Sequence, residues 1–115
     1  MSKRDDSVTL NDMHQHACEA LELLGDASPD DLGRNRVVQL ALTRLIEIIG
    51  KAAYRVSPEM RDANRQIPWA QIIGMRNRLI HGYDVIDFDL LWSTIKTDIP
   101  TLIVAIEEAL KKTED

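Results

Sequence analysis

Several features that would place a protein outside the cytoplasm are missing from this sequence. Its one cysteine, Cys18, cannot form an internal disulfide, so nothing in it requires an oxidising compartment. No apolar run approaches the roughly 18–20 residues needed to span a bilayer. Residues 1–6 lack the apolar core of a secretory signal peptide. We therefore expect a cytoplasmic protein that does not associate with a membrane.

Common nucleotide-binding and hydrolase motifs are also missing. The sequence has no Walker phosphate loop, no dinucleotide-binding glycine fingerprint and no serine nucleophile elbow. What remains is a chain of 115 residues, of which 44% are hydrophobic and 29% charged. This composition is ordinary for a globular chain and excludes disorder, collagen and disulfide scaffolds as descriptions of the whole protein. The length predicts a single domain over residues 1–115.

Apolar residues recur at the spacing of an α-helix along nearly the whole chain. No segment shows convincing two-residue alternation over the length of a strand. The stripes predict helices over about 10–24, 32–56, 68–81, 87–99 and 102–110. The second of these is apolar around much of its surface, so it is either central to the domain or shared with a second copy of the chain. The connections are short, and the sequence therefore predicts an all-α bundle of four or five helices.

Short local signals predict where these helices begin and end. Thr9 with Asp12 indicates the start of the first helix, and Gly25 indicates its end. The composition of residues 26–31 predicts a linker that carries the cap of the next helix. The later signals are Ser57–Pro58 at the end of the second helix, Pro68 in the first turn of the third, Gly82 as its terminator, Asp87 as the cap of the fourth and Pro100 as a kink or break.

The formal net charge of −5 argues against a nucleic-acid binder when it is taken alone. Its distribution changes that interpretation. Residues 1–33 carry a net charge of −6, residues 34–78 a net charge of +6, and residues 79–115 a net charge of −5. Eight of the nine basic residues in the central block are arginines, whose planar guanidinium suits phosphate recognition. The alternative is that these side chains are solvated or paired with the acidic flanks.

The segment 75–84 gathers the side chains that carry chemistry. His81 is the one group here whose unperturbed pKa, near 6.5, suits proton transfer at neutral pH. Arg76 or Arg78 could stabilise negative charge that develops on a phosphate. These groups are sufficient for RNA cleavage without a metal. In that reaction a neutral histidine takes the proton of a ribose 2′-hydroxyl while an arginine stabilises the phosphate.

Helix geometry limits what one copy of this segment can build. Asn77 and His81 are four residues apart and would share a helix face. Arg76 and His81 are five apart and would project roughly 140° from each other on an ideal helix. A second protomer presenting the same segment across a two-fold axis would complete the site. The structural alternative is that His81 satisfies the last carbonyl groups of a helix.

The segment resembles a known family. Residues 76–83, Arg-Asn-Arg-Leu-Ile-His-Gly-Tyr, match the Arg-x4-His-x-Tyr signature of HEPN-domain proteins (higher eukaryotes and prokaryotes nucleotide-binding). More narrowly, the sequence is similar to the HepT-type toxins of prokaryotic type VII toxin–antitoxin pairs. The similarity extends over nearly the whole chain, through segments 44–50, 67–69, 72–77 and 98–100.

This resemblance implies a fold, an activity and partners. The fold would be a HEPN-like helical bundle that forms a homodimer with a shared cleft. Arg76 and His81 would be the catalytic ribonuclease pair acting on RNA, with Asn77 and Arg78 as polar support. The partner would be an MntA-type nucleotidyltransferase antitoxin that transfers AMP to Tyr83. The added nucleotide would place a bulky anion beside the catalytic pair and block the substrate phosphate.

One departure from the family concerns Lys51. Many relatives have an acidic residue after the glycine of the second helix, here Gly50, whereas this chain has a lysine. The departure weakens any role for an acid at that position and leaves the signature untouched.

Weaker signals have structural explanations. His14 and Cys18 lie four apart on a predicted helix, but two ligands do not make a metal site. Asp84, Asp87 and Asp89 lack the glycine and terminal glutamate of a calcium loop. We expect Trp69 and Trp92 to make core or dimer contacts rather than to stack on bases. The prediction is therefore a protein with no metal and no cofactor.

Three hypotheses follow from the sequence. The first is a dimeric ribonuclease toxin that works through Arg76 and His81. The second is a non-catalytic subunit that presents a nucleotide or substrate to a minimal nucleotidyltransferase. The third is a helical interaction domain in which the motif only caps a helix.

Overall fold

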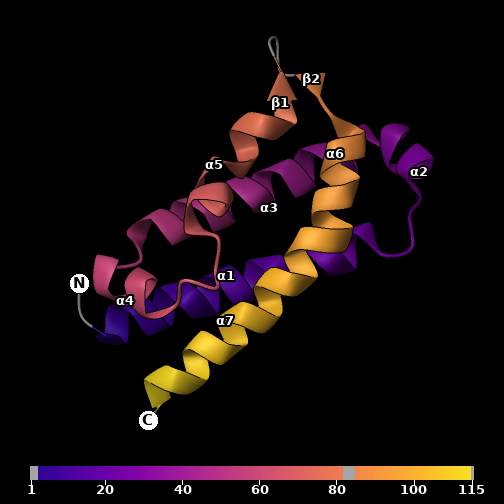
Figure 1. Cartoon of the computed structure of the whole chain (residues 1–115). Coiled ribbons are helices and arrows are strands. Elements are labelled where there is room, and N and C mark those ends of the chain that lie inside the picture. The colour runs from indigo at the N-terminus through magenta and orange to yellow at the C-terminus, as the bar shows by residue number, and fades with distance from the viewer. Residues whose placement is uncertain (1–2, 82–84, 115) are drawn as a thin grey trace.

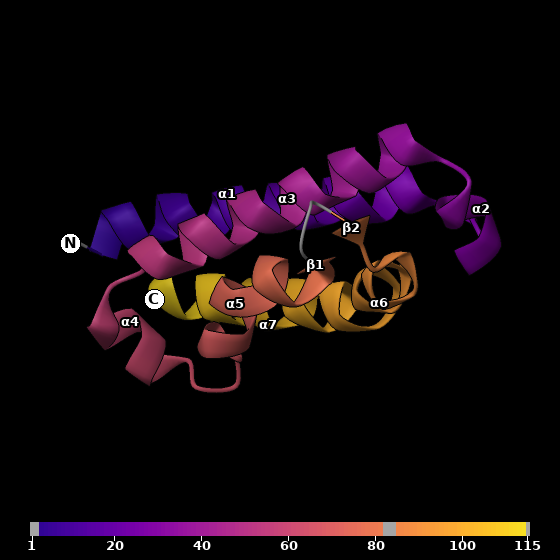
Figure 2. The same cartoon turned by 90° about the horizontal axis from the view of Figure 1, so that it is seen from above.

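The chain folds into two layers of helices (Figure 1). The computed structural model describes residues 3–81 and 85–114, and it describes the side chains of all of these except residues 3, 4, 81 and 114. In the first layer, α1 (Lys3–Leu24) and α3 (Arg36–Arg55) run antiparallel. The second layer contains α5 (Trp69–Leu79), α6 (Phe88–Ser93) and α7 (Ile99–Glu114) (Figure 2). Helix α1 packs against both α3 and α7, while α5 packs against α3. This arrangement confirms the all-α bundle.

Short elements join the long helices. They are α2 (Pro29–Gly33), α4 (Pro58–Ala63), the strands β1 (Ile80–His81) and β2 (Val85–Ile86), and a π-helix, η2 (Thr94–Asp98). None of the helices in the described part of the chain is both long and apolar enough to cross a membrane.

Four local signals give the helix ends that they predict. Gly25 has a φ of +54°, the left-handed conformation that ends α1. Ser28 and Asp31 form a reciprocal capping box at the start of α2. Ser57 ends α3 and caps α4, and the Asp87 carboxylate accepts a hydrogen bond from the backbone N–H of Leu90 at the start of α6.

The first predicted helix start is wrong. Helix α1 begins at Lys3, and Thr9 lies inside it, where its Oγ1 donates a hydrogen bond to the Asp5 carbonyl. The early start is supported by Asp6, whose buried carboxylate accepts hydrogen bonds of 2.9 and 2.6 Å from the backbone N–H and hydroxyl of Ser57. Because Ser57 lies 51 residues away, no local pattern could show this contact.

The helix predicted over 32–56 is two helices. Helix α2 ends at Gly33 and α3 begins at Arg36, because the Asn35 side chain accepts a hydrogen bond from the backbone N–H of Val38. Asparagine competes with the helix for backbone hydrogen bonds and therefore favours such a cap over a helix interior.

The third helix ends at Leu79 rather than at Gly82. Ile80 and His81 leave the helix and pair antiparallel with Ile86 and Val85. The backbone N–H of Asp87 also donates to the Leu79 carbonyl over 2.8 Å. The β-branched residues on both strands favour this short ribbon, and it satisfies a carbonyl group that the helix end would leave free.

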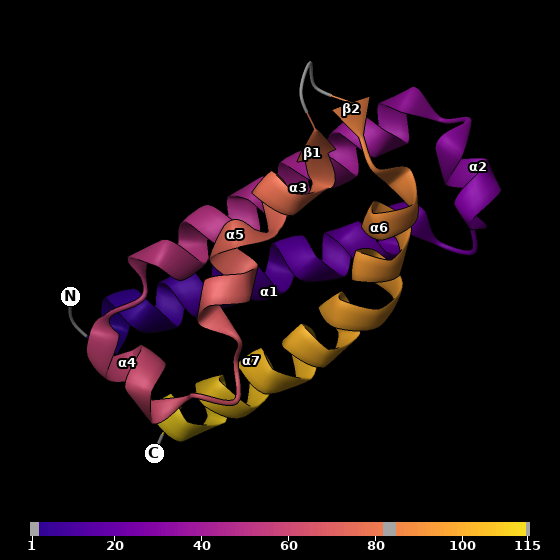
Figure 3. The same ribbon diagram turned by 45° about the horizontal axis from the view of Figure 1, so that its top comes forward.

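Pro100 disturbs a continuous helix as predicted. Helices α6 and α7 follow one another through η2, which ends two residues before Pro100, in the first turn of α7 (Figure 3). Proline has no N–H for the carbonyl four residues earlier, and a π-helical turn is one way in which a helix accommodates such a break.

The core lies between the two layers. Its largest fully buried side chains are Leu10, Met13, Leu32, Leu42, Ile46, Ile49, Ile67, Leu79, Leu91, Ile95, Ile99 and Ile106. Both tryptophans pack against the edge of this core, as expected. The Trp92 indole donates to the Ala27 carbonyl over 2.8 Å, and the Trp69 indole donates to the carbonyls of Arg61 and Asn64.

Candidate functional site

An open groove of about 750 Å³ runs along the outer side of α3, next to α5. We call it the α3–α5 groove and define it by its polar lining side chains: Arg44, Glu47, Lys51, Tyr54, Arg55, Arg76 and Asn77. Four of these seven are cationic and one is acidic. The groove therefore offers an anionic ligand several positive charges in one place.

The groove depends on a close approach of two helices at Gly50. A methyl group added at this residue would lie 3.1 Å from the Ile72 carbonyl oxygen and 3.4 Å from the Ile73 carbonyl oxygen. Only a residue without a side chain leaves α3 and α5 this close without a shift. This contact sets how near the end of α5 comes to α3.

Arg76 on α5 and Glu47 on α3 form an ion pair near the close approach of the two helices at Gly50. The Arg76 Nε lies 2.6 Å from the Glu47 Oε2, and the two side chains are 43% and 22% exposed. The other carboxylate oxygen, Oε1, pairs with Arg44 one turn earlier on α3 and lies 3.9 Å from the Lys51 Nζ one turn later. One carboxylate therefore interacts with three cations.

These contacts lower the pKa of Glu47. The hydrogen bond from Arg44 is the largest cause, and the charges of Lys51, Arg76 and Arg44 add to it. Burial acts in the opposite direction and is outweighed. Glu47 is therefore ionised at neutral pH and holds the cations in place as a fixed charge.

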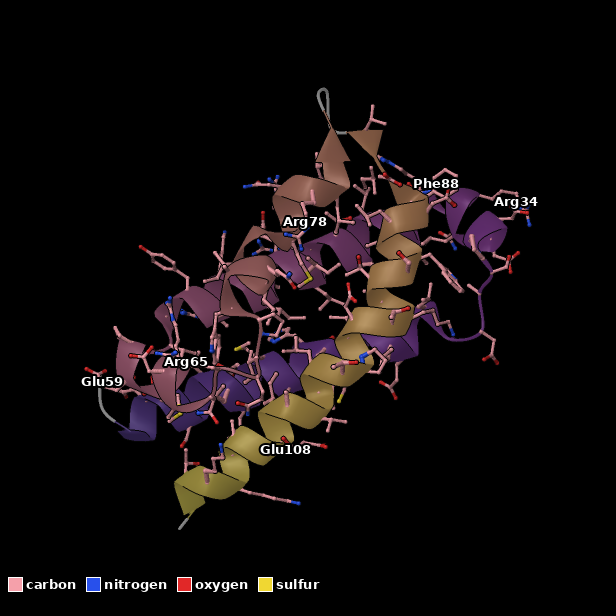
Figure 4. All side chains as sticks on the ribbon, in the orientation of Figure 1. Arg34, Glu59, Arg65, Arg78, Phe88 and Glu108 are labelled. Atoms are coloured by element: carbon pink, nitrogen blue, oxygen red, sulfur yellow. The ribbon has the colours of Figure 1, made fainter. Side chains whose placement is uncertain are left out.

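The structure separates the two polar neighbours of Arg76. Asn77 lines the α3–α5 groove beside it. Arg78 lies on another side of α5 (Figure 4), where its Nη2 donates to the Gln71 carbonyl over 3.0 Å. There it lines a smaller hollow between α5 and the start of α7. Arg76 and Asn77 are thus brought together, and Arg78 is not.

His81 lies on β1, opposite Val85. The angle of 140° expected between Arg76 and His81 on one helix does not apply, because the helix ends between them at Leu79. The His81 side chain and the whole of Tyr83 lie outside the described residues, so their predicted roles stay predictions.

Comparison with known proteins finds a family model and relatives that match most of this chain. A family model described as "Ribonuclease HepT-like" matches residues 13–109. A "Putative RNase" of Methanocaldococcus jannaschii is 35% identical over 107 residues, which cover 93% of this chain and 98% of the relative. A "Probable ribonuclease HepT" of Thermococcus cleftensis is 33% identical over 104 residues, which cover 87% of this chain and 94% of the relative.

The chain belongs to the HepT-like ribonuclease family. No solved structure matches it. The matched range contains the whole α3–α5 groove and the Arg-x4-His-x-Tyr segment.

Glu47 is a residue of this HepT-like groove to which the sequence analysis gave no functional role. It lies 29 positions before Arg76, and its acidic side chain comes one helical turn before Lys51. The available signal was the spacing of Arg44, Glu47 and Lys51, which places one acid between two bases on a helix face. That spacing predicts ion pairs within α3 but does not indicate the contact with α5.

Members of the central basic block of the HepT-like chain differ in their surroundings. Arg44, Lys51, Arg55 and Arg76 line the groove. Arg34 pairs with Asp31, and Arg65 lies 3.9 Å from Asp62, near opposite ends of the molecule (Figure 4). The alternative of pairing with an acidic flank is confirmed for Arg34, and phosphate recognition by the groove cations stays a prediction.

The weaker signals have structural roles. The His14 Nε2 lies 2.9 Å from the Glu107 Oε2 and so ties α1 to α7. Burial, followed by the charges of Glu107 and Glu22, raises the pKa of the Cys18 thiol. In the described part of the chain, no three His, Cys, Asp or Glu side chains are grouped to hold a metal ion.

Proposed function

We propose that this HepT-like chain is a metal-independent endoribonuclease in which Arg76 and His81 are the catalytic residues. The observation that carries the proposal is the placement of Arg76, a half-exposed guanidinium in a cationic groove, five residues before His81. Membership of a ribonuclease family supports RNA as the substrate.

The proposed reaction uses only groups of the protein and the RNA. Neutral His81 takes the proton of a ribose 2′-hydroxyl, whose oxygen attacks the adjacent phosphorus. The bond from phosphorus to the 5′ oxygen breaks, and that oxygen takes a proton. The products are a 2′,3′-cyclic phosphate and a 5′-hydroxyl end. Arg76 stabilises the negative charge that develops on the phosphate oxygens.

The α3–α5 groove is the proposed path of the RNA. Arg44, Lys51 and Arg55 project along it and would interact with neighbouring phosphates of a single strand. Tyr54 is 70% exposed at the same wall and offers a ring on which an unpaired base can stack.

A homodimer would complete this site. Val37 and Leu40 on α3 are 76% and 49% exposed and, three residues apart, lie on one face of the helix. A two-fold axis near α3 would cover them and bring two Arg-x4-His segments to one cleft.

The cellular role that we propose is that of a toxin acting in the cytoplasm. An MntA-type nucleotidyltransferase would neutralise it, with ATP as the AMP donor. The Tyr83 hydroxyl oxygen would attack the α-phosphorus of ATP, pyrophosphate would leave, and the phenolic proton would pass to solvent. The attached nucleotide would then occupy the cationic groove in place of RNA.

Cleavage of cellular RNA by the purified protein in excess EDTA tests the activity. We expect the wild type to leave 2′,3′-cyclic phosphate ends and His81→Ala and Arg76→Ala to lose about 100- to 1,000-fold in rate. His16→Ala and Arg65→Ala are matched controls outside the groove and should cleave like the wild type. Intact RNA with the unmodified wild type would contradict the ribonuclease proposal.

Intact-mass measurement after incubation with the nucleotidyltransferase and ATP tests the modification. We expect a gain of one or more AMP units that Tyr83→Phe abolishes, while Tyr54→Phe gains mass like the wild type. An unchanged wild-type mass would remove the modification. If the partner binds but the chain never cleaves RNA, a non-catalytic binding subunit describes the protein better.

A further inference from the structure

We infer that Glu47 is a positioning residue that holds Arg76 through its Nε atom and leaves the two terminal nitrogens of the guanidinium to the substrate phosphate. The inference rests on the proposed ribonuclease function and assigns a role to a side chain outside the Arg-x4-His-x-Tyr segment. It concerns the orientation of Arg76, and Glu47 itself does not touch the RNA.

The first argument is which atom of Arg76 the carboxylate contacts. The closest approach of the ion pair is 2.6 Å, between the Glu47 Oε2 and the Arg76 Nε, and in the described residues neither Nη1 nor Nη2 donates a hydrogen bond. A guanidinium binds phosphate best through a pair of parallel N–H groups. A contact at Nε fixes the plane of the group while its outer edge stays open to the groove.

The second argument is that Glu47 is itself held in place. Its Oε1 pairs with Arg44 on the preceding turn and lies 3.9 Å from Lys51 on the following turn. The carboxylate is only 22% exposed. It is therefore oriented from both sides along α3, and Arg76 meets an oxygen whose position is already set.

The third argument is where the two helices meet. Glu47 lies one turn before Gly50, where α3 and α5 come into backbone contact. Arg76 lies one turn after Ile72, whose carbonyl makes that contact. The pair thus lies beside the point at which the backbones of α3 and α5 approach each other closely.

A different role for Glu47 is to occupy the phosphate site when RNA is absent. A carboxylate that imitates phosphate would take the paired terminal nitrogens of Arg76, as phosphate does. The closest approach at Nε favours positioning instead. The two roles also predict opposite effects, because removing a phosphate mimic raises activity whereas removing a positioning group lowers it.

The charge of Glu47 gives the positioning role a distinctive kinetic signature. A carboxylate in the groove weakens the attraction of the four cations for RNA, so its neutralisation should strengthen binding. The same change frees Arg76 to move away from the reacting phosphate, so it should slow the chemical step. A variant whose fold was merely disturbed would not bind RNA more tightly while its chemical step became slower.

The test compares Glu47→Gln and Glu47→Asp with the wild type on a short RNA in EDTA. For Glu47→Gln we expect kcat to fall about 10- to 100-fold while KM is unchanged or lower. Glu47→Asp should recover part of the lost kcat, because it keeps the charge. Glu107→Gln, which neutralises a glutamate on α7 that is hydrogen-bonded to His14, is the matched control and should behave like the wild type.

A double variant shows whether Glu47 acts through Arg76. In the Arg76→Ala background, Glu47→Gln should cause no further loss of kcat. A kcat of Glu47→Gln equal to or above that of the wild type would overturn the inference, as would an equal fold-loss in both backgrounds. Circular dichroism and thermal unfolding would identify a variant that is misfolded, in which case Glu47→Asp carries the comparison.

A measurement without cleavage separates this inference from the proposed function. The motion of the Arg76 Nε–H group, measured by ¹⁵N relaxation in NMR, should be restricted in the wild type and less restricted in Glu47→Gln. Equal motion in the two proteins would overturn the inference even in an active enzyme. Restricted motion in a protein that cleaves no RNA would refute the ribonuclease proposal, and with it the positioning role, while confirming the contact.

Discussion

The pair α1 and α7 and the pair α3 and α5 differ in charge and in what they do with it. Helices α1 and α7 together carry four basic and eight acidic side chains, whereas α3 and α5 carry six basic and one acidic. The single acid of the second pair, Glu47, lies among the cations of the α3–α5 groove. The two pairs carry net charges of −4 and +5, so the total of −5 for the whole chain does not describe the local field that an RNA phosphate would meet.

The two regions also use long-range polar contacts differently. On α1, the buried Asp6 carboxylate accepts two hydrogen bonds from Ser57 and fixes the helix start. On α5, Arg76 keeps 43% of its side chain exposed although it is ion-paired. The first contact is closed to solvent and serves stability, whereas the second leaves a charged group accessible to a ligand.

The largest expected effect tests whether the α1–α7 side is mainly structural. Ile106→Ala on α7 removes a fully buried side chain and should lower the free energy of unfolding by about 2–5 kcal/mol. Val104→Ala, two residues earlier and 56% exposed, should change it by less than about 0.5 kcal/mol. Urea unfolding measures both. If the folded Ile106→Ala protein also lost cleavage, the two regions would not be separable.

The next effect lies where the groove is built. Gly50→Ala should be less stable than Gly74→Ala by about 1–3 kcal/mol. Both changes gain helix propensity equally, but at Gly74 the nearest atom to an added methyl is a flexible arginine nitrogen 3.6 Å away, not a backbone oxygen at 3.1 Å. Thermal unfolding and cleavage should be measured together. We expect only Gly50→Ala to lose activity, because it moves α5 and with it Arg76.

A smaller effect concerns the attraction of the groove for RNA. Lys51→Ala and Arg55→Ala should each reduce the slope of log K against log salt by about 0.7, the value for one lost contact to a single strand. Binding is measured with an oligonucleotide that carries 2′-deoxyribose and cannot be cleaved. Lys111→Ala at the end of α7 should leave the slope unchanged. Equal slopes for all four proteins would mean that the RNA does not follow the groove.

The smallest effect is the pH dependence of the Glu47 ion pairs. Because Arg44, Lys51 and Arg76 lower the pKa of Glu47 in the folded protein, its ionised form stabilises the fold. The wild type should be more stable than Glu47→Gln by less than about 1 kcal/mol above the ordinary glutamate pKa of about 4.3. This difference should vanish as pH falls through the lowered value. A difference that grows in acid would contradict the assigned direction of the pKa shift.

Local signals in the sequence predicted local features of the fold. Gly25, Ser57 and Asp87 end or cap helices as expected, because each acts within about four residues of itself. The start assigned near Thr9 failed because α1 is extended by a contact with Ser57. The end assigned to Gly82 failed because a strand pairing takes over at Ile80.

The same division applies to the site. The signature from Arg76 to Tyr83 is contiguous, so it could be recognised without a structure. The groove could not, because it depends on Gly50 of α3 meeting the carbonyl of Ile72 on α5. The placement of Arg78 could not be recognised from the sequence either, because Arg78 lies only two residues from Arg76 and yet lines another hollow.

The sequence by itself determined the helical class, the helix ends signalled by Gly25, Ser57 and Asp87, and the position of the Arg-x4-His-x-Tyr segment. Each of these depends on hydrophobic periodicity or on residues that are neighbours in the chain. Only the tertiary structure decided which arginines share a groove and which acid lies beside Arg76. Electrostatic and hydrogen-bonding energies depend on distances between atoms, and the 2.6 Å between Glu47 and Arg76 exists only after two helices have packed.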